Sequence, residues 1–192
     1  MILYLHGFLS SPASTKARLL RAALERAGRG GDFACPQLPV SPRAAAEVAL
    51  ATAQLEAPDR LALVGSSLGG FYATWLAERL GCRAVLLNPA VRPHVDLRSR
   101  VGMQVDPATG RQVEIPPEAL DELAALEVPH ITLPQRYLLV AATGDEVLDY
   151  RQMLERYAGC PTHLVQGSDH ALGDFALHLP RVLRFCGLPV PD

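Results

Sequence analysis

The pentapeptide at residues 65–69, Gly-Ser-Ser-Leu-Gly, is the part of this sequence that most constrains its fold. An apolar run at residues 62–64 leads directly into it, and an amphipathic segment at residues 68–80 follows it. A strand, a sharp turn and a helix in direct succession need glycine on both sides of the turn, because the strand and the helix nearly touch there. The sequence therefore predicts a tight turn that projects Ser67 into solvent. A glycine-rich turn without chemistry is the alternative, and the rest of the chain has to decide between them.

Short apolar runs alternate with segments of helical spacing along most of the chain, which has 192 residues. The runs predict six strands, at residues 2–5, 33–35, 60–64, 84–87, 136–142 and 162–165. Helices are predicted at residues 14–27, 44–55, 68–80, 150–157 and 172–185. This alternation predicts an α/β fold with a mostly parallel sheet, helices on both faces and ligands at the carboxyl ends of the strands.

The alternation fails between residues 90 and 135, where six prolines interrupt the pattern. Only residues 117–126 keep helical spacing in this stretch. Long irregular connections are usually functional, so we expect a short cap-like insertion at residues 90–135, with a long surface loop as the alternative. Because the length suits one domain and no stretch has the composition of a flexible linker, residues 1–192 are predicted to form a single domain.

Three chemically active side chains follow predicted strands in the order Ser67, Asp145 and His170. This is the chain order of nucleophile, acid and base in α/β-hydrolases, whose sites lie at the carboxyl ends of parallel strands. A serine hydroxyl needs a base to take its proton as it attacks, and an acidic side chain holds that base in position. We therefore predict a catalytic triad of these three residues. Glu146 and Asp149 compete with Asp145 for the acidic role, although each can instead cap the following helix.

Backbone N–H groups are expected to stabilise the negative charge that the attack creates. The first is the N–H of Leu68, directly after the nucleophile, and the second is the N–H of Phe8, since the first strand should neighbour the third. Phe8, Asn88 and Arg92 also follow strands and are predicted to contact the substrate. For Arg92, a structural salt bridge is the alternative to binding an anionic substrate group. His6 is expected to shape the loop that carries Phe8.

Charge and residue spacing exclude several kinds of partner. The formal net charge is −2, and Lys16 is the only lysine among 18 cationic residues, which are scattered along the chain. This pattern provides no basic patch for nucleic acid or an anionic membrane, and no apolar stretch approaches the ~18 residues of a membrane span. No set of His, Cys and carboxylate residues has metal-ligand spacing, so neither a metal nor a cofactor is predicted. The remaining histidines are expected to be packing or surface residues: His94, His130, His163 and His178.

The cysteines and the amino terminus bear on the cellular compartment. Four cysteines occur singly, without C-x-x-C spacing: Cys35, Cys82, Cys160 and Cys186. Free thiols in a reducing cytosol are the simplest interpretation. The first residues lack the positive and long apolar regions of a signal peptide, so we expect a cytoplasmic protein. The oligomeric state cannot be read from the sequence.

Seven short blocks of sequence, spread over nearly the whole chain, carry a resemblance to a known family. They are HGF at residues 6–8, SSP at 10–12, PQLP at 36–39, GSSLGGFYATWL at 65–76, NPAVRP at 88–93, TGDEVLDYR at 143–151 and GSDHA at 167–171. Together, and in this order, they resemble the small bacterial esterases of the YqiA/YcfP family. The resemblance implies a small α/β-hydrolase fold, esterase activity on acyl esters and thioesters, and a triad at Ser67, Asp145 and His170. This chain departs from the family at Asp169, where the family commonly has asparagine, so an extra carboxylate precedes the histidine.

The leading hypothesis is a serine esterase that hydrolyses a small-molecule acyl ester through an acyl-enzyme intermediate. A thioesterase, peptidase or acyltransferase on the same triad is a second hypothesis, because the triad alone does not select the bond that is cleaved. A binding protein on a hydrolase scaffold is a third. Covalent labelling of Ser67 by a fluorophosphonate separates the binding protein from the enzymes.

Overall fold

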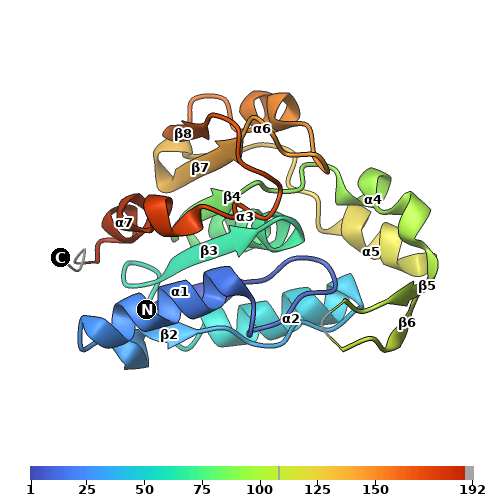
Figure 1. The fold of residues 1–192 in the computed structure, drawn as a ribbon, viewed down its shortest axis with the longest axis horizontal. Coiled ribbons are helices and arrows are strands. Elements are labelled where there is room, and N and C mark those ends of the chain that lie inside the picture. Colours follow the sequence, from blue (N-terminus) through green and yellow to red (C-terminus); the bar gives the residue numbers. More distant parts are fainter. Residues whose placement is uncertain (108, 189–192) are drawn as a thin grey trace.

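Six short strands form one sheet in the computed structural model, which describes residues 1–107 and 109–188. The strands are β1 (Ile2–Leu5), β2 (Phe33–Ala34), β3 (Ala62–Ser66), β4 (Arg83–Leu87), β7 (Tyr137–Ala142) and β8 (Thr162–Val165). They lie in the order β2-β1-β3-β4-β7-β8, and every neighbouring pair is parallel (Figure 1). The predicted six-stranded sheet is confirmed, including the pairing of the first strand with the third.

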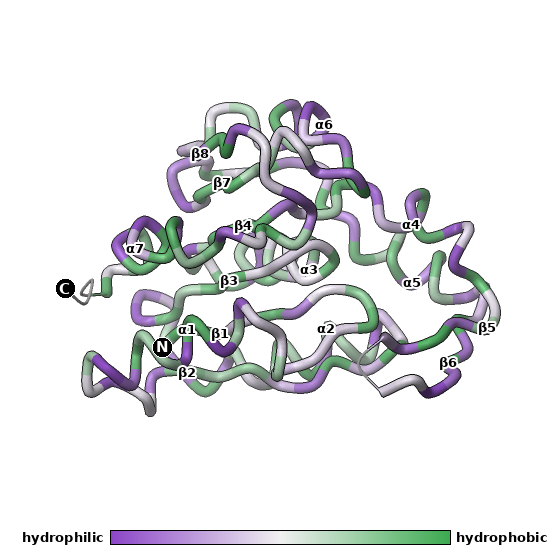
Figure 2. Tube along the Cα trace, in the orientation of Figure 1, coloured by the Kyte–Doolittle hydropathy of each residue, from purple (hydrophilic) through white to green (hydrophobic). Residues whose placement is uncertain are grey.

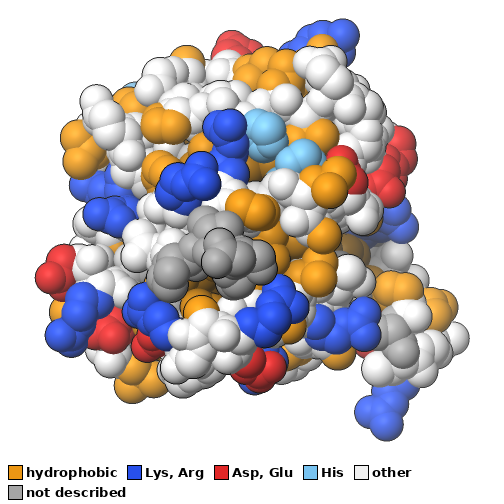
Figure 3. All heavy atoms as spheres, turned by 60° about the vertical axis from the view of Figure 1, so that its left-hand side comes forward, with side chains coloured by type: hydrophobic (Ala, Val, Ile, Leu, Met, Phe, Trp, Pro, Cys, Tyr) orange, Lys and Arg blue, Asp and Glu red, His pale blue; other side chains and the backbone are white. Residues whose placement is uncertain are grey.

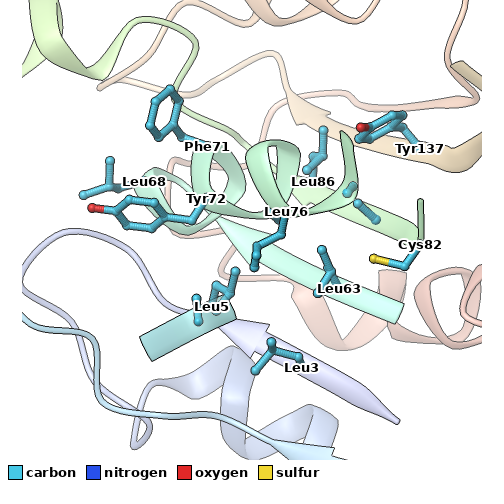
Figure 4. Packing of buried hydrophobic residues seen from close by; sticks show 14 of the residues in the cluster. Leu3, Leu5, Leu63, Leu68, Phe71, Tyr72, Leu76, Cys82, Leu86 and Tyr137 are labelled. Atoms are coloured by element: carbon cyan, nitrogen blue, oxygen red, sulfur yellow. The ribbon is translucent and has the colours of Figure 1, made fainter. Parts of the chain in front are cut away.

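Helices cover both faces of this sheet. α1 (Thr15–Arg26) and α7 (Phe175–Phe185) pack on one face, and α2 (Pro42–Ala53), α3 (Leu68–Leu80) and α6 (Tyr150–Arg156) pack on the other. Successive side chains of a strand point to opposite faces, so Ile2 and Tyr4 join the core beneath α1 and α7. Leu3 and Leu5 join the core on the other face, where Figure 4 shows them with Leu76 of α3.

The strands are hydrophobic on both faces, as a parallel sheet between two helix layers requires. All six residues of β7 are buried, and all five of β3 are buried. Along the chain, hydrophobic segments follow the central strands, whereas hydrophilic segments lie mostly in loops and on outer helix faces (Figure 2). The continuous apolar runs in the sequence therefore mark the interior of the sheet.

Two helices begin two or more residues away from the predicted start. α2 starts at Pro42, two residues earlier, because Ser41 caps it: the Oγ atom accepts a hydrogen bond from the N–H of Ala44 at 3.2 Å. α7 starts at Phe175, three residues later, because Leu172 has a φ of 49°, which is outside the helical range. The other predicted ends lie within two residues of the observed ones.

The predicted insertion contains more regular structure than expected. It holds α4 (Pro93–Asp96), β5 (Gly102–Val105), β6 (Gln112–Ile115) and α5 (Glu118–Ala125), of which the sequence predicted only α5. β5 and β6 form an antiparallel hairpin that pairs Met103 with Glu114. Each strand has only four residues, so its alternation of polar and apolar side chains is a weak signal in the sequence, and the prolines nearby favour an irregular segment. The insertion lies beyond the carboxyl ends of the strands, at the right of Figure 1.

The surface carries mixed charge. Over the face shown in Figure 3, basic side chains are dispersed among acidic, polar and hydrophobic ones. All four cysteines are free thiols. In the part of the chain that the structure describes, no helix is long and apolar enough to cross a membrane.

Candidate active site

Ser67 occupies the turn between β3 and α3 with φ 53° and ψ −121°, a backbone conformation that residues other than glycine rarely adopt. The two glycines of the pentapeptide make this turn possible. A Cβ atom at Gly65 would lie 2.2 Å from the carbonyl oxygen of Gly69, and one at Gly69 would lie 1.9 Å from the carbonyl oxygen of Leu5. β1, β3 and α3 therefore approach one another too closely to admit a side chain at either position.

The side chains of Ser67, His170 and Asp145 are joined by hydrogen bonds. The Nε2 atom of His170 lies 3.0 Å from Ser67 Oγ, and its Nδ1 atom lies 2.8 Å and 3.0 Å from the two carboxylate oxygens of Asp145. The carboxylate accepts a hydrogen bond from the N–H at Nδ1, which leaves Nε2 as the acceptor for the serine hydroxyl. The side chain of Asp145 is 0% exposed and that of His170 is 20% exposed. The structure thus brings the three predicted triad residues together from the loops after β3, β7 and β8.

Burial and hydrogen bonding act in opposite directions on Asp145. Burial alone would raise the pKa of this carboxyl group, but hydrogen bonds from His170 and from the N–H groups of Val147 and Leu148 hold its pKa below the ordinary value. The two N–H groups donate to Oδ1 at 2.9 Å and 2.8 Å. The carboxylate is therefore kept ionised beside the imidazole ring, and its own loop fixes its position.

The two competing carboxylates near Asp145 have other partners. An Oε2 atom of Glu146 accepts a hydrogen bond from the backbone N–H of His170 at 2.9 Å, so this side chain holds the loop rather than the ring. Asp149 caps α6, because its Oδ1 atom accepts a hydrogen bond from the N–H of Arg151 at 2.9 Å. The structure therefore places Asp145, and neither competitor, against the imidazole ring.

The N–H groups of Phe8 and Leu68 belong to segments that adjoin Ser67. A Cβ atom at Gly7 would lie 3.3 Å from the Cβ atom of Ser67, so the loop after β1 runs directly beside the serine. Leu68 follows Ser67 at the amino-terminal end of α3. Within residues 1–107 and 109–188, neither N–H group has a hydrogen-bond acceptor, which leaves both available to an oxygen of a ligand.

His6 holds the loop that carries Phe8. It is only 3% exposed. Its Nε2 atom accepts a hydrogen bond from the N–H of Leu38 at 3.0 Å, and its Nδ1 atom lies 3.1 Å from the carbonyl oxygen of Gly7. Burial lowers the pKa of His6, and the bond to Gly7 opposes that effect. A neutral ring that accepts at Nε2 and donates at Nδ1 satisfies both contacts, in agreement with the expected shaping role.

Asn88 has a different role from the one predicted, because its side chain is buried and cannot contact a substrate. Its Oδ1 atom accepts a hydrogen bond from the N–H of Ala142 at 2.8 Å, and its Nδ2 atom donates to the carbonyl oxygens of Asp169 and His170, each at 3.1 Å. Asn88 thus joins β4 to β7 and to the loop of His170. The sequence placed the residue at the correct edge of the sheet but did not determine the direction of its side chain.

Arg92 is exposed and is not among the residues that line the cleft above Ser67. Its Nη2 atom lies 3.4 Å from Oε1 of Gln152. Burial raises the pKa of Asp96, and the charge of Arg92 offsets only part of this rise. Two other cationic residues line the cleft instead, Lys16 and Arg100. Sequence reasoning missed both, although the occurrence of a single lysine in the chain was a signal for Lys16.

A further set of side chains supports the loop of His170. Ser168 Oγ donates a hydrogen bond to Asp174 Oδ1 at 2.5 Å, and Asp174 Oδ2 lies 3.1 Å from His178 Nε2. His178 Nδ1 in turn lies 3.0 Å from His163 Nε2. This network connects the loop to α7 and β8, and it gives His163 and His178 the packing role that was expected of them.

The cleft above Ser67 has a volume of about 780 Å³ and lies between the strand ends and the insertion. Hydrophobic side chains in its lining include Phe8, Leu9, Leu97, Val105, Val147 and Leu148. Ser67 and His170 also line it, so the hydrogen-bonded pair is open to a ligand. Across the described residues, no three His, Cys, Asp or Glu side chains are grouped as a metal site would require.

A parallel sheet, a tight turn that presents a serine, and a histidine and an aspartate bonded to it from later strand ends define an α/β-hydrolase fold. The solved structure of a putative hydrolase from Agrobacterium vitis S4 has this fold, with a TM-score of 0.78 and 19% identity over 96% of this chain and 87% of that one. The chain belongs to the uncharacterised protein family UPF0227, whose model matches residues 1–187. This confirms the resemblance to the YqiA family.

Other similar structures have been described with ester chemistry. One comes from the work on LipS and LipT, two metagenome-derived lipolytic enzymes, with a TM-score of 0.71 and 20% identity over 97% of this chain and 92% of that one. The carboxylesterase CesB from Bacillus subtilis has a TM-score of 0.58 and 17% identity over 97% of this chain and 83% of that one. At these identities the likeness shows a shared fold.

Proposed function

We propose that this protein is a serine esterase that hydrolyses small-molecule acyl esters through an acyl-enzyme intermediate. The observation that carries the proposal is the unbroken set of hydrogen bonds from Asp145 through His170 to Ser67, at 2.8 Å and 3.0 Å, on the lining of an open cleft. A buried, ionised carboxylate is the group that orients a histidine and stabilises it once it takes up a proton. Such an arrangement activates a serine hydroxyl to accept an acyl group and to pass it on to water.

Each step follows from this geometry. Ser67 Oγ attacks the carbonyl carbon of the ester, and His170 Nε2 takes the hydroxyl proton. The N–H groups of Phe8 and Leu68 stabilise the oxygen anion of the tetrahedral intermediate. His170 then gives the proton to the leaving alcohol, which departs and leaves an ester on Ser67. Water, activated by the same histidine, attacks that ester and releases the carboxylic acid.

The hydrophobic part of the cleft lining and the similar structures support an ester with an apolar acyl group. Val105, Val147 and Leu148 offer apolar surface to such a group, whose burial contributes roughly 25 cal/mol per Å². Lipolytic activity and carboxylester hydrolysis are described for two proteins of the same fold.

The replacement Ser67→Ala tests the proposal. We expect the wild-type protein to hydrolyse p-nitrophenyl butyrate and Ser67→Ala to lose about 10⁴- to 10⁶-fold in kcat, because the attacking oxygen is gone. The circular dichroism spectrum and the melting temperature should stay close to those of the wild type. A variant that keeps a comparable kcat would exclude Ser67 as the nucleophile.

A fluorophosphonate probe separates the proposed enzyme from a binding protein of the same fold. We expect one adduct per chain, on Ser67 in the wild type and absent from Ser67→Ala, read by mass spectrometry of the peptides. A protein that only binds ligands should not react at this serine. Matched oxygen-ester, thioester and amide substrates then identify the bond that is cleaved.

A further inference from the structure

Lys16 is the only lysine of the chain, and all the other cationic residues are arginines. It lies in the first turn of α1, is half-buried, and lines the cleft above Ser67. Lysine presents a compact ammonium group with three donors on a flexible stem, whereas arginine presents a planar fork. A single lysine at the edge of the candidate site therefore raises the question of what its ammonium group does there.

The contacts of Lys16 are directed at the loop of the histidine. Its Nζ atom donates a hydrogen bond to the carbonyl oxygen of Ala171, the residue directly after His170. Burial lowers the pKa of Lys16, and the negative charges of Asp169 and Asp145 act in the opposite direction. Asp169 also braces the loop, since its Oδ1 atom accepts a hydrogen bond from the backbone N–H of Gly173 at 2.8 Å. The ammonium group is thus bound to the loop, within the influence of two carboxylate charges.

This loop is irregular, and side chains from other elements hold it in place. The backbone has a φ of 58° at Ser168, outside the regions that most residues favour. Asn88 donates to two successive carbonyl oxygens of the loop, and Glu146 accepts the hydrogen bond of the N–H between them. Lys16 supplies the corresponding contact from α1. Each of these side chains binds backbone atoms within one residue of the imidazole.

We propose that Lys16 is a positioning residue for the general base, because its bond to Ala171 holds His170 at the place where Nε2 reaches Ser67 Oγ. The distance between those two atoms is 3.0 Å. A displacement of about 1 Å at such a contact can reduce a rate by about 10²-fold even when the altered residue lies outside the chemistry. This inference rests on the proposed esterase function.

The variant Lys16→Met tests the role, since it keeps the aliphatic stem and removes the ammonium group. We expect kcat for p-nitrophenyl butyrate to fall about 10- to 100-fold with KM within twofold of the wild type, because the lost interaction positions the base and does not bind substrate. The rate of fluorophosphonate labelling at Ser67 should fall by the same factor. The matched control is Arg18→Met, on the exposed side of the same helix, which should behave as the wild type.

Two outcomes of the kinetic experiment would overturn the inference. An unchanged kcat in Lys16→Met would show that the loop holds its position without the ammonium group. A rise in KM at constant kcat would show that Lys16 contacts the substrate and does not position the histidine. If the wild type neither hydrolyses esters nor reacts with the probe, the proposed function fails first.

Proton NMR reports on the position of the ring independently of activity. The proton on His170 Nδ1 is hydrogen-bonded to the carboxylate of Asp145 at 2.8 Å, and imidazole protons bound to a carboxylate resonate far downfield of ordinary amides. We expect this signal to shift or broaden in Lys16→Met and to stay unchanged in Arg18→Met. An unchanged signal in Lys16→Met would contradict the positioning role even in a protein that is active.

Discussion

Ser67 holds a backbone conformation that costs of order 1–3 kcal/mol for a residue with a side chain, and the surrounding backbone maintains it. Its N–H donates to the carbonyl oxygen of Leu87 at 3.0 Å, and its own carbonyl oxygen accepts from the N–H groups of Gly70 and Ala90 at 2.9 Å and 3.0 Å. The end of β4 thus helps to hold the turn of β3. Main-chain bonds thus fix the backbone of Ser67, and with it the point from which the side chain projects.

At the scale of a single residue, His6 makes stability depend on pH. Burial lowers its pKa in the folded protein, so the unfolded chain takes up the proton first as the pH falls below about 6.5. The stabilising contribution is therefore complete above that pH and is lost as the pH falls toward the lower, folded pKa. We expect the free energy of unfolding in urea to decrease from about pH 7.5 to about pH 5.5 in the wild type and to decrease less in His6→Gln.

His163 also contributes to the pH dependence of stability, because burial and the charges of Arg181 and His178 lower its pKa as well. Its contribution has to be measured separately from that of His6. The variant His163→Gln measures that separate contribution. Equal pH dependence in the wild type and in His6→Gln would show that His6 does not contribute.

At the scale of an element, the strand β3, the turn at Ser67 and the helix α3 form one unit. This unit requires the backbone of α3 to lie so close to the backbones of β1 and β3 that no Cβ atom fits between them. Nine of the thirteen residues of α3 are buried, so the helix runs through the core and not along the surface. Its first turn contacts the end of β1 through Gly69, where a Cβ atom would overlap a carbonyl oxygen. The helix cannot shift outward to make room without breaking the core contacts of its buried face.

The variant Gly69→Ala should therefore lose about 3 kcal/mol in the free energy of unfolding, because the overlap is with backbone atoms that cannot rotate away. Gly31→Ala is the matched control, since a Cβ atom there meets nothing within 4 Å. Its effect should stay within about 1 kcal/mol. Urea unfolding of both variants measures the difference, and similar stabilities would show that the turn is more plastic than its geometry implies.

At the scale of the whole molecule, the candidate site is assembled from the loops after β1, β3, β4, β7 and β8, which approach one another at one edge of the sheet. Asn88 is the side chain that joins three of these segments, because it bonds Ala142 as well as Asp169 and His170. Its φ of 43° is tolerated better by asparagine than by most residues. Stability and the geometry of the base thus depend on the same buried amide.

We expect Asn88→Gly to lose about 3 kcal/mol of stability, because buried backbone groups are left without partners. Glycine accepts the positive φ, so the change removes only the side chain. The kcat on p-nitrophenyl butyrate should fall at least about tenfold, since the loop of the histidine is released. The control is Thr74→Val on α3, which removes a buried hydroxyl bonded to the carbonyl oxygen of Gly70 and to the hydroxyl of Tyr157. It should reduce stability but leave kcat near that of the wild type. Equal effects on kcat would assign both changes to general destabilisation.

The sequence by itself determined the six strands, the five helices around them and the turn at Ser67. These features depend on local properties, namely apolar periodicity and the absence of side chains at Gly65 and Gly69. The order of Ser67, Asp145 and His170 predicted the candidate site, because parallel strands bring their carboxyl ends to one edge whatever the details of the loops.

Only the tertiary structure decided how the side chains at that edge are directed. It turned Asn88 inward, separated Asp145 from Glu146, brought Lys16 to the loop of the histidine, and formed the hairpin of β5 and β6. These outcomes depend on contacts between segments far apart in the chain, and periodicity carries no information about them. The pattern of apolar residues is enough to predict which edge of the sheet carries the site. The direction of each side chain at that edge depends on how distant segments of the chain pack together.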